Sequence, residues 1–247
     1  MLDKPNFSPR KECVVLWKRT RKDYILTSIK MLESITNLTA EELIAAGTVA
    51  VNKPKGVSSH RVINELRKYT GLKRIGHAGT LDPLASGVLV VAIGRENTKK
   101  ISEIVKDEKE YVADIRLDGL SATQDMEGPI TAITLPEKLP SLNEMAEAVK
   151  KFIGKIKQTP SIYSAIKIDG KPAYKYAREG KDIEMRVREV EIKSIEILEY
   201  NFPMLKLKVQ TGPGTYIRTL AEDLGKSLGL GGYLTDLRRT RVGGFEL

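Results

Sequence analysis

The sequence has very little cysteine and histidine. Among its 247 residues, Cys13 is the single cysteine, and His60 and His77 are the two histidines. One cysteine excludes a disulfide within the chain and is typical of a reducing compartment. These three residues cannot form a cysteine-rich zinc site, which argues against a zinc-dependent nucleobase deaminase. The chain also lacks an apolar run of the roughly 18–20 residues that a membrane span needs, and a signal peptide. We therefore expect a cytoplasmic protein that contacts no membrane.

The common cofactor-binding motifs are missing as well. Gly225-Lys226-Ser227 imitates the end of a phosphate loop, but Leu220 stands where that motif requires a glycine. No Gly-x-Gly-x-x-Gly follows a predicted strand, which argues against a dinucleotide or methyl-donor site. Neither histidine lies near a serine nucleophile motif. The sequence therefore predicts no metal and no cofactor.

Positive charge is abundant. The chain has 41 Lys and Arg against 32 Asp and Glu, a net charge of +9, with a pI near 9.4. Such a surplus favours an anionic partner, most often nucleic acid, although a soluble protein can be basic without one. Seven of the basic residues lie within residues 1–22. This arm is either a solvated tail or a strap that contacts RNA.

The hydrophobic pattern indicates an α+β protein with a mixed, largely antiparallel sheet flanked by helices. A capping box, Thr39 with Glu42, predicts a helix over Thr39–Ala46. Further helices are predicted from Ser58 or Ser59 to Tyr69, from Ser141 to Gly154, and from a Thr215 cap onward. Strands are predicted at Val49–Val51, Val88–Ile93, Tyr111–Leu117, Arg186–Tyr200 and Met204–Gln210, with a hairpin turn at Asp169-Gly170.

Two stretches are candidates for chemistry. Residues 76–87 carry one carboxylate, Asp82, in a loop rich in glycine and followed by Pro83. Asp82 can be an Asx-turn residue or a functional group beside an apolar pocket. Residues 212–218 form a glycine-rich turn that leads into a helix carrying Tyr216 and Arg218. The Arg218 guanidinium can lie on the surface, or it can pair with a buried carboxylate and keep it ionised.

Several motifs together resemble the TruB family of tRNA pseudouridine synthases, over about 195 residues from Val49 onward. Residues 76–87 are similar to the catalytic motif of that family. Matching segments follow in the same order along the chain, namely 53–59 (KPKGVSS), 109–111 (KEY), 161–180 (SIYSAIKIDGKPAYKYAREG), 214–225 (GTYIRTLAEDLG) and 237–240 (LRRT).

The resemblance implies isomerisation of uridine to pseudouridine at position 55 in the T-arm of tRNA, with the target base flipped out of its stack. It implies that Asp82 is the nucleophile, acting on the ribose, on the base or through a glycal. Arg218 is expected to pair with Asp82, and Tyr111 to stack on the base and move a proton.

The resemblance also implies a set of substrate-binding residues. Tyr216 and Leu237 would line the pocket for the base, and His77 would stabilise the flipped-out arrangement. Asp125 would organise contacts to RNA or within the site. Lys53 would contact RNA or support the site, or it is a surface lysine.

We expect three features of organisation. Residues 1–48 form a basic N-terminal extension, residues 49–247 form the catalytic domain, and the C-terminal PUA domain usual in the family is absent. We expect a monomer that needs no protein partner. The alternatives are a non-catalytic tRNA-binding or folding module on the same scaffold, and a relative that works within a guide-RNA particle.

Overall fold

The computed structural model describes Leu32, residues 35–181 and residues 183–247. The basic arm of residues 1–22 lies outside the described residues. The helices are α2 (Ala40–Ala46), α3 (Ser59–Thr70), α4 (Arg95–Ile104), α5 (Leu142–Lys150), α6 (Ala173–Arg178) and α7 (Ile217–Ser227). The main strands are β1 (Thr48–Lys53), β3 (Ser86–Ile93), β4 (Lys109–Arg116), β7 (Gly154–Gln158), β10 (Arg188–Asn201), β11 (Met204–Thr211) and β12 (Tyr233–Val242). The short strands are β2 (Ile75–His77), β5 (Gly119–Ser121), β6 (Ile130–Ala132), β8 (Lys167–Ile168), β9 (Lys171–Pro172) and β13 (Phe245–Glu246).

A nine-stranded sheet forms the centre of the molecule, with its strands in the order β1-β3-β12-β4-β11-β10-β7. β2 pairs with β3, and β13 pairs with β12. Each neighbouring pair is antiparallel except β3 and β12, which are parallel. The predicted α+β fold with a largely antiparallel sheet is confirmed.

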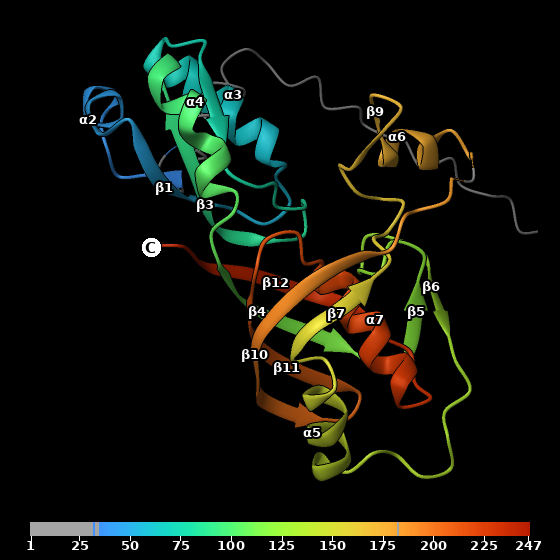
Figure 1. Cartoon of the computed structure of the whole chain (residues 1–247). Helices are drawn as coiled ribbons and strands as arrows, with labels where there is room; N and C mark the ends of the chain where they lie inside the picture. The colour runs from blue at the N-terminus through green and yellow to red at the C-terminus, as the bar shows by residue number, and fades with distance from the viewer. Residues whose placement is uncertain (1–31, 33–34, 182) are drawn as a thin grey trace, which may run out of the picture.

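Helices cover the two ends of this sheet separately (Figure 1). α2, α3 and α4 gather around β1, β2 and β3, where Leu43 and Val62 belong to one buried hydrophobic cluster. α5 and α7 lie with β4, β10 and β11 over the larger cluster, which includes Met145 and Leu220. A small hairpin, β8 with β9, projects with α6 beyond the sheet (Figure 1). None of the helices in the described ranges is both long and apolar enough to cross a membrane.

The two ends of the sheet meet where β3 pairs with β12. This contact is short, with Ser86 opposite Arg238 and Gly87 opposite Arg239. Gly87 has φ +97°, and a Cβ there would stand 2.2 Å from the backbone oxygen of Arg239. Only glycine fits both conditions, because other residues rarely adopt that φ and their Cβ would collide with β12. The family-like segment 76–87 therefore ends where the two ends of the sheet join.

Several predicted elements are confirmed at their termini. Thr39 and Glu42 form the expected capping box of α2, and Ser58 caps α3 by accepting from the Arg61 amide. The helix that begins after Ser141 ends at Lys150, so its predicted extension to Gly154 is wrong. Gly154, with φ +99°, instead begins β7.

The predicted Thr215 cap of α7 is also wrong. Tyr216 is the N-cap residue, and its side chain makes no capping hydrogen bond. The side chain of Gln158 instead holds the backbone of the N-cap residue, since Oε1 accepts from the Tyr216 amide at 3.0 Å and Nε2 donates to the Tyr216 carbonyl at 3.2 Å. β7 therefore fixes the start of α7 through a side chain 58 positions away in sequence.

Candidate active site

A cavity of about 320 Å³ opens beside the junction of β3 and β12. Its walls come from five separate segments, at residues 79–82, 105–111, 164–166, 214–218 and 237–239. This volume is at the lower end of the usual range for small-molecule sites, about 300–1,000 Å³. Five of the predicted site residues line the cavity, namely Asp82, Tyr111, Tyr216, Arg218 and Leu237.

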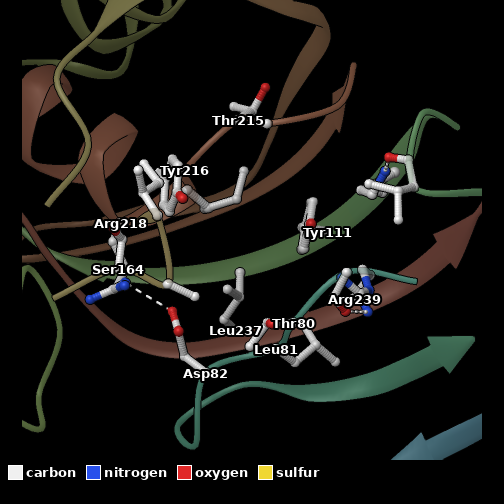
Figure 2. A pocket seen from close by; sticks show the side chains of 17 residues that line it. Thr80, Leu81, Asp82, Tyr111, Ser164, Thr215, Tyr216, Arg218, Leu237 and Arg239 are labelled. Atoms are coloured by element: carbon white, nitrogen blue, oxygen red, sulfur yellow. Dashed lines mark hydrogen bonds and ion pairs between the residues drawn. The ribbon is translucent and has the colours of Figure 1, made fainter. Parts of the chain in front are cut away.

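Asp82 and Arg218 form an ion pair at one side of this cavity (Figure 2). Arg218 Nε lies 2.9 Å from Asp82 Oδ2. The Arg218 side chain is 6% exposed, whereas 37% of the Asp82 side chain remains accessible from the cavity. No hydrogen bond joins the Asp82 carboxylate to a nearby backbone amide in the described chain. The geometry therefore favours the functional interpretation of Asp82 over an Asx turn.

The other nitrogens of Arg218 hold it in place. Nη1 donates to the Thr123 carbonyl at 2.8 Å, and Nη2 donates to the Tyr163 carbonyl at 3.1 Å. Nη1 also lies 3.5 Å from Asp125 Oδ2. Because these acceptors surround a planar guanidinium, its orientation toward Asp82 is fixed.

Asp125 is almost completely buried and is the second carboxylate in contact with Arg218. Its Oδ1 accepts from Thr123 Oγ1 at 2.5 Å and from the Glu127 amide at 3.0 Å. Gln124, next to it, has φ +64° and is held by α7, because its Oε1 accepts from Thr219 Oγ1 at 3.1 Å. Asp125 thus contacts Arg218 from the protein interior and does not line the cavity itself.

Burial raises the pKa of Asp82 above its ordinary value. Removing a carboxylate from water penalises its charged form, and the neighbouring charge of Asp125 adds to the effect. Arg218 acts in the opposite direction, through its charge and its hydrogen bond, and so does Lys53 through its charge. The sequence predicted only that Arg218 favours the charged form of the carboxylate. In the structure, burial has the larger effect on the pKa of Asp82 and favours the neutral form. A carboxylate that lies in a cavity and has a perturbed pKa is frequent at catalytic sites.

The loop that carries Asp82 is held on both sides by the β1–α3 connection. Ser59 is buried, and its hydroxyl accepts from the Leu81 amide and donates to the Leu81 carbonyl, both at 2.9 Å. After Asp82, the Pro83 carbonyl accepts from the Gly56 amide at 2.7 Å. The segment 53–59 therefore positions the backbone on either side of the carboxylate.

Lys53 belongs to the same support. It is fully buried, and its ammonium donates to the carbonyls of Pro54 at 2.9 Å, Val57 at 2.5 Å and Pro83 at 3.4 Å. Burial lowers the pKa of Lys53 to about 8, while the charge of Asp82 opposes the shift. Since its donors point at backbone carbonyls, the structure favours a supporting role for Lys53 over contact with RNA.

The walls of the cavity are aromatic and aliphatic. Leu237 on β12 lies beside Asp82, Tyr111 on β4 lies farther along the cavity toward Arg239, and Tyr216 lies above Arg218 (Figure 2). Burial raises the pKa of the Tyr216 hydroxyl. Flat apolar walls of this kind suit a small planar ring such as a pyrimidine.

His77 lies outside the cavity, on β2. Its side chain is half-buried, and its Nδ1 is sealed from solvent without a hydrogen-bond partner among the described residues. Burial, together with the charges of Arg239 and His60, lowers the pKa of His77. His77, like Lys53 and Asp125, is therefore a predicted substrate-binding residue that does not line the cavity.

Sequence reasoning left four groups at the site without a role. Arg239, Lys109 and Ser164 line the cavity, and Gln158 holds Tyr216. Each lies within a segment already noted or next to one, but only the fold shows that their side chains converge. In the part of the chain that the structure describes, no three His, Cys, Asp or Glu side chains are arranged to bind a metal ion.

Residues 67–217 match the family model described as the N-terminal domain of TruB family pseudouridylate synthase. Residues 218–247 match that of the tRNA pseudouridylate synthase B C-terminal domain. This chain belongs to the TruB family. In the structure, the boundary between the two matches falls within α7, and β12 from the second match lies between β3 and β4 of the first.

Curated relatives carry the same family name. Two proteins named tRNA pseudouridine synthase B are similar to the chain. The one from Corynebacterium diphtheriae is 45% identical over 84% of this chain and 71% of its own length. The one from Francisella tularensis is 44% identical over 81% of this chain and 66% of its own length.

A solved structure is similar as well. A chain in the crystal structure of a Cbf5-Nop10-Gar1 complex is 32% identical, with a TM-score of 0.63. The match covers 85% of this chain and 52% of that one, so our chain spans about half of its length. These relatives favour an isomerase over a non-catalytic binding module.

Proposed function

We propose that this protein isomerises uridine to pseudouridine at position 55 in the T-arm of tRNA. The observation that carries the proposal is the Asp82–Arg218 ion pair, which lies at a nucleotide-sized cavity in a member of the TruB family. The net charge of +9 suits an RNA substrate. We further propose that the protein acts on tRNA in the cytoplasm, and that it does so as a monomer.

The reaction rearranges bonds without a net change in atoms. The bond between uracil N1 and ribose C1′ breaks, a bond from C5 to C1′ forms, and the proton lost from C5 is balanced by one gained at N1. The target nucleotide must leave its stack to reach Asp82, which costs a few kcal/mol. Asp82 then acts as a carboxylate, attacking the ribose or the base or promoting a glycal.

Each neighbour contributes to that step through its position. Arg218 keeps the carboxylate oriented and favours its charged form, which is the nucleophilic one. Tyr111 lies against the base and is placed to move a proton, and Leu237 and Tyr216 exclude water from the reacting atoms. Asp125 and Lys53 position Arg218 and the Asp82 loop, and His77 stabilises the flipped-out RNA outside the cavity.

We further propose that residues 49–247 form the catalytic unit, with residues 1–48 as an extension. Within that extension, Ile35 and Leu43 are buried in the cluster around β1 and α3. A role in a guide-RNA particle is the second candidate, because the similar Cbf5 chain was solved in a complex with Nop10 and Gar1. The relatives named tRNA pseudouridine synthase B favour the free tRNA enzyme.

The proposal can be tested with a tRNA transcript labelled with tritium at uridine C5. Pseudouridine formation releases this tritium into water, whereas binding alone does not. We expect the protein to release the label of one uridine per tRNA, and a transcript with cytidine at position 55 to release none. Equal release from both transcripts would show that the modified uridine lies elsewhere. Release only with an added guide RNA would favour the second candidate.

A further inference from the structure

Two buried cations lie at the end of the cavity away from Asp82. Figure 2 shows Arg239 on the opposite side from the Asp82–Arg218 pair, with Leu237 and Thr80 between them. Arg239 is 1% exposed and Lys109 is 6% exposed, and both side chains line the cavity. The reaction proposed above gives neither of them a role.

The side chains of Arg239 and Lys109 both lie next to Gly79. A Cβ built on Gly79 would lie 3.6 Å from Arg239 Nη1 and 3.9 Å from Lys109 Cε. Gly79 has φ +95° and carries no side chain to fill that space. Like charges this close repel each other, and burial adds to the cost. Accordingly, burial lowers the pKa of Lys109 and the charge of Arg239 lowers it further, while the charge of Asp107 opposes the shift.

Neither group is paired directly with a carboxylate within the described ranges. Arg239 donates from Nε to the Val88 carbonyl at 2.8 Å and from Nη2 to the Gly79 carbonyl at 3.1 Å. Lys109 donates to the carbonyls of Val105 at 2.9 Å and Asp107 at 2.6 Å. These neutral acceptors hold the side chains in place, and the charge of Asp107 compensates that of Lys109 only in part, since the pKa of Lys109 stays lowered. Neither forms an ion pair within 4.0 Å in the described chain, and Nη1 of Arg239 has no hydrogen-bond partner there.

We propose that Arg239 and Lys109 bind a backbone phosphate of the RNA, namely the phosphate attached to the nucleotide whose base reaches Asp82. This inference rests on the proposed function. A flipped nucleotide carries its base, ribose and phosphate in a row, and the cavity offers apolar walls near the carboxylate and two cations at the far end. A guanidinium and an ammonium are the usual protein ligands of phosphate. The phosphate would supply the missing negative charge and fix how deeply the nucleotide enters.

Binding of a T-arm stem-loop RNA tests this subsite, with one phosphate at a time replaced by a neutral methylphosphonate. The measurements use the full chain carrying Asp82→Asn, so that the RNA stays unmodified. We expect one replacement, next to the target uridine, to weaken binding about tenfold, whereas its effect falls below about twofold when Arg239→Gln or Lys109→Gln is added. Each added variant should also reduce the slope of log affinity against log salt concentration by about one.

Arg241→Gln is the matched control. Arg241 lies on β12 like Arg239, but its Nη1 donates to the Gly243 carbonyl and it does not line the cavity. In this control, the methylphosphonate replacement at the same phosphate should still weaken RNA binding about tenfold. Thermal unfolding shows whether Arg239→Gln or Lys109→Gln fails to fold. If one of them does, the binding result of the other variant tests the subsite. The subsite is overturned if methylphosphonate replacement lowers the affinity equally at all phosphates. It is also overturned if the loss of affinity at the phosphate next to the target uridine is unchanged in both Arg239→Gln and Lys109→Gln. Such a result leaves tritium release, and with it the proposed function, unaffected.

Discussion

Arg218 contacts two carboxylates at once, with Nε 2.9 Å from Asp82 Oδ2 and Nη1 3.5 Å from Asp125 Oδ2. Asp82 opens into the cavity, whereas Asp125 is buried and held by Thr123 and the Glu127 amide. One cation therefore balances a carboxylate that is open to the cavity and a second one that is buried. This division explains why Asp125 can support the site without lining it.

The first prediction concerns Arg218→Gln. Removing the guanidinium leaves the Asp125 charge buried without a partner, which we expect to lower the free energy of unfolding by about 3 kcal/mol. It also frees the Asp82 side chain, which we expect to slow turnover by about 100-fold. Urea unfolding and single-turnover tritium release measure the two effects.

The double variant Arg218→Gln with Asp125→Asn separates them. Because Asp125→Asn removes the orphaned charge, most of the lost stability should return, while turnover should stay low. Recovery of turnover together with stability would mean that Arg218 acts only on the fold.

The second prediction is the acid limb of the pH–rate profile. The active form of Asp82 is the carboxylate, and its pKa is raised by burial, so activity should fall as pH drops through a value above the ordinary value of about 3.9. Arg218 lowers this pKa and Asp125 raises it. The limb should therefore move to higher pH in Arg218→Gln and to lower pH in Asp125→Asn. Single-turnover rates across the pH range test both directions, and a limb that stays in place in both variants would assign it to another group.

The third prediction concerns Lys53→Met. This change removes the donors to the Pro54, Val57 and Pro83 carbonyls, which should cost about 1–3 kcal/mol of stability and slow turnover by loosening the Asp82 loop. Lys55→Met is the matched control, since Lys55 is half-exposed and pairs with Asp236 on the surface. We expect that control to change stability by less than about 1 kcal/mol.

The effect of Lys53 on stability should also depend on pH. Its pKa is about 8 in the folded protein and about 10.5 when unfolded. Between these values the unfolded chain binds more protons, so the Lys53 protein gains stability as pH rises. Relative to Lys53→Met, the wild-type protein should become more stable from about pH 8 to about pH 10. A constant difference over this range would show that Lys53 titrates normally.

Local signals in the sequence predicted much of the fold. The capping box at Thr39, the helix start at Ser141 and the hairpin turn at Asp169-Gly170 each depend on a few neighbouring residues. The start of α7 at Tyr216 could not be predicted in this way, because Gln158 holds the Tyr216 backbone from a distant strand. The position of β12 between β3 and β4 is likewise a long-range pairing without a local pattern.

The site residues that lie within the family-like motifs could be predicted from the sequence. The resemblance to the TruB motifs predicts that Arg218 pairs with Asp82, and the structure brings the two together. The upward pKa shift of Asp82 depends on how much protein surrounds the loop, which composition does not show. The convergence of Arg239 with Lys109 depends on the pairing of β12 with β4, so it became visible only in the fold.

The most direct test of the account is tritium release by Asp82→Asn from tRNA labelled at uridine C5. Asp236→Asn is the matched control, because Asp236 on β12 pairs with Lys55 at the surface and does not line the cavity. We predict release at the wild-type rate by Asp236→Asn and none by Asp82→Asn, with tRNA affinity within about twofold of wild type for both. Release by Asp82→Asn at a rate near that of the control would contradict the central claim that the Asp82 carboxylate carries the reaction.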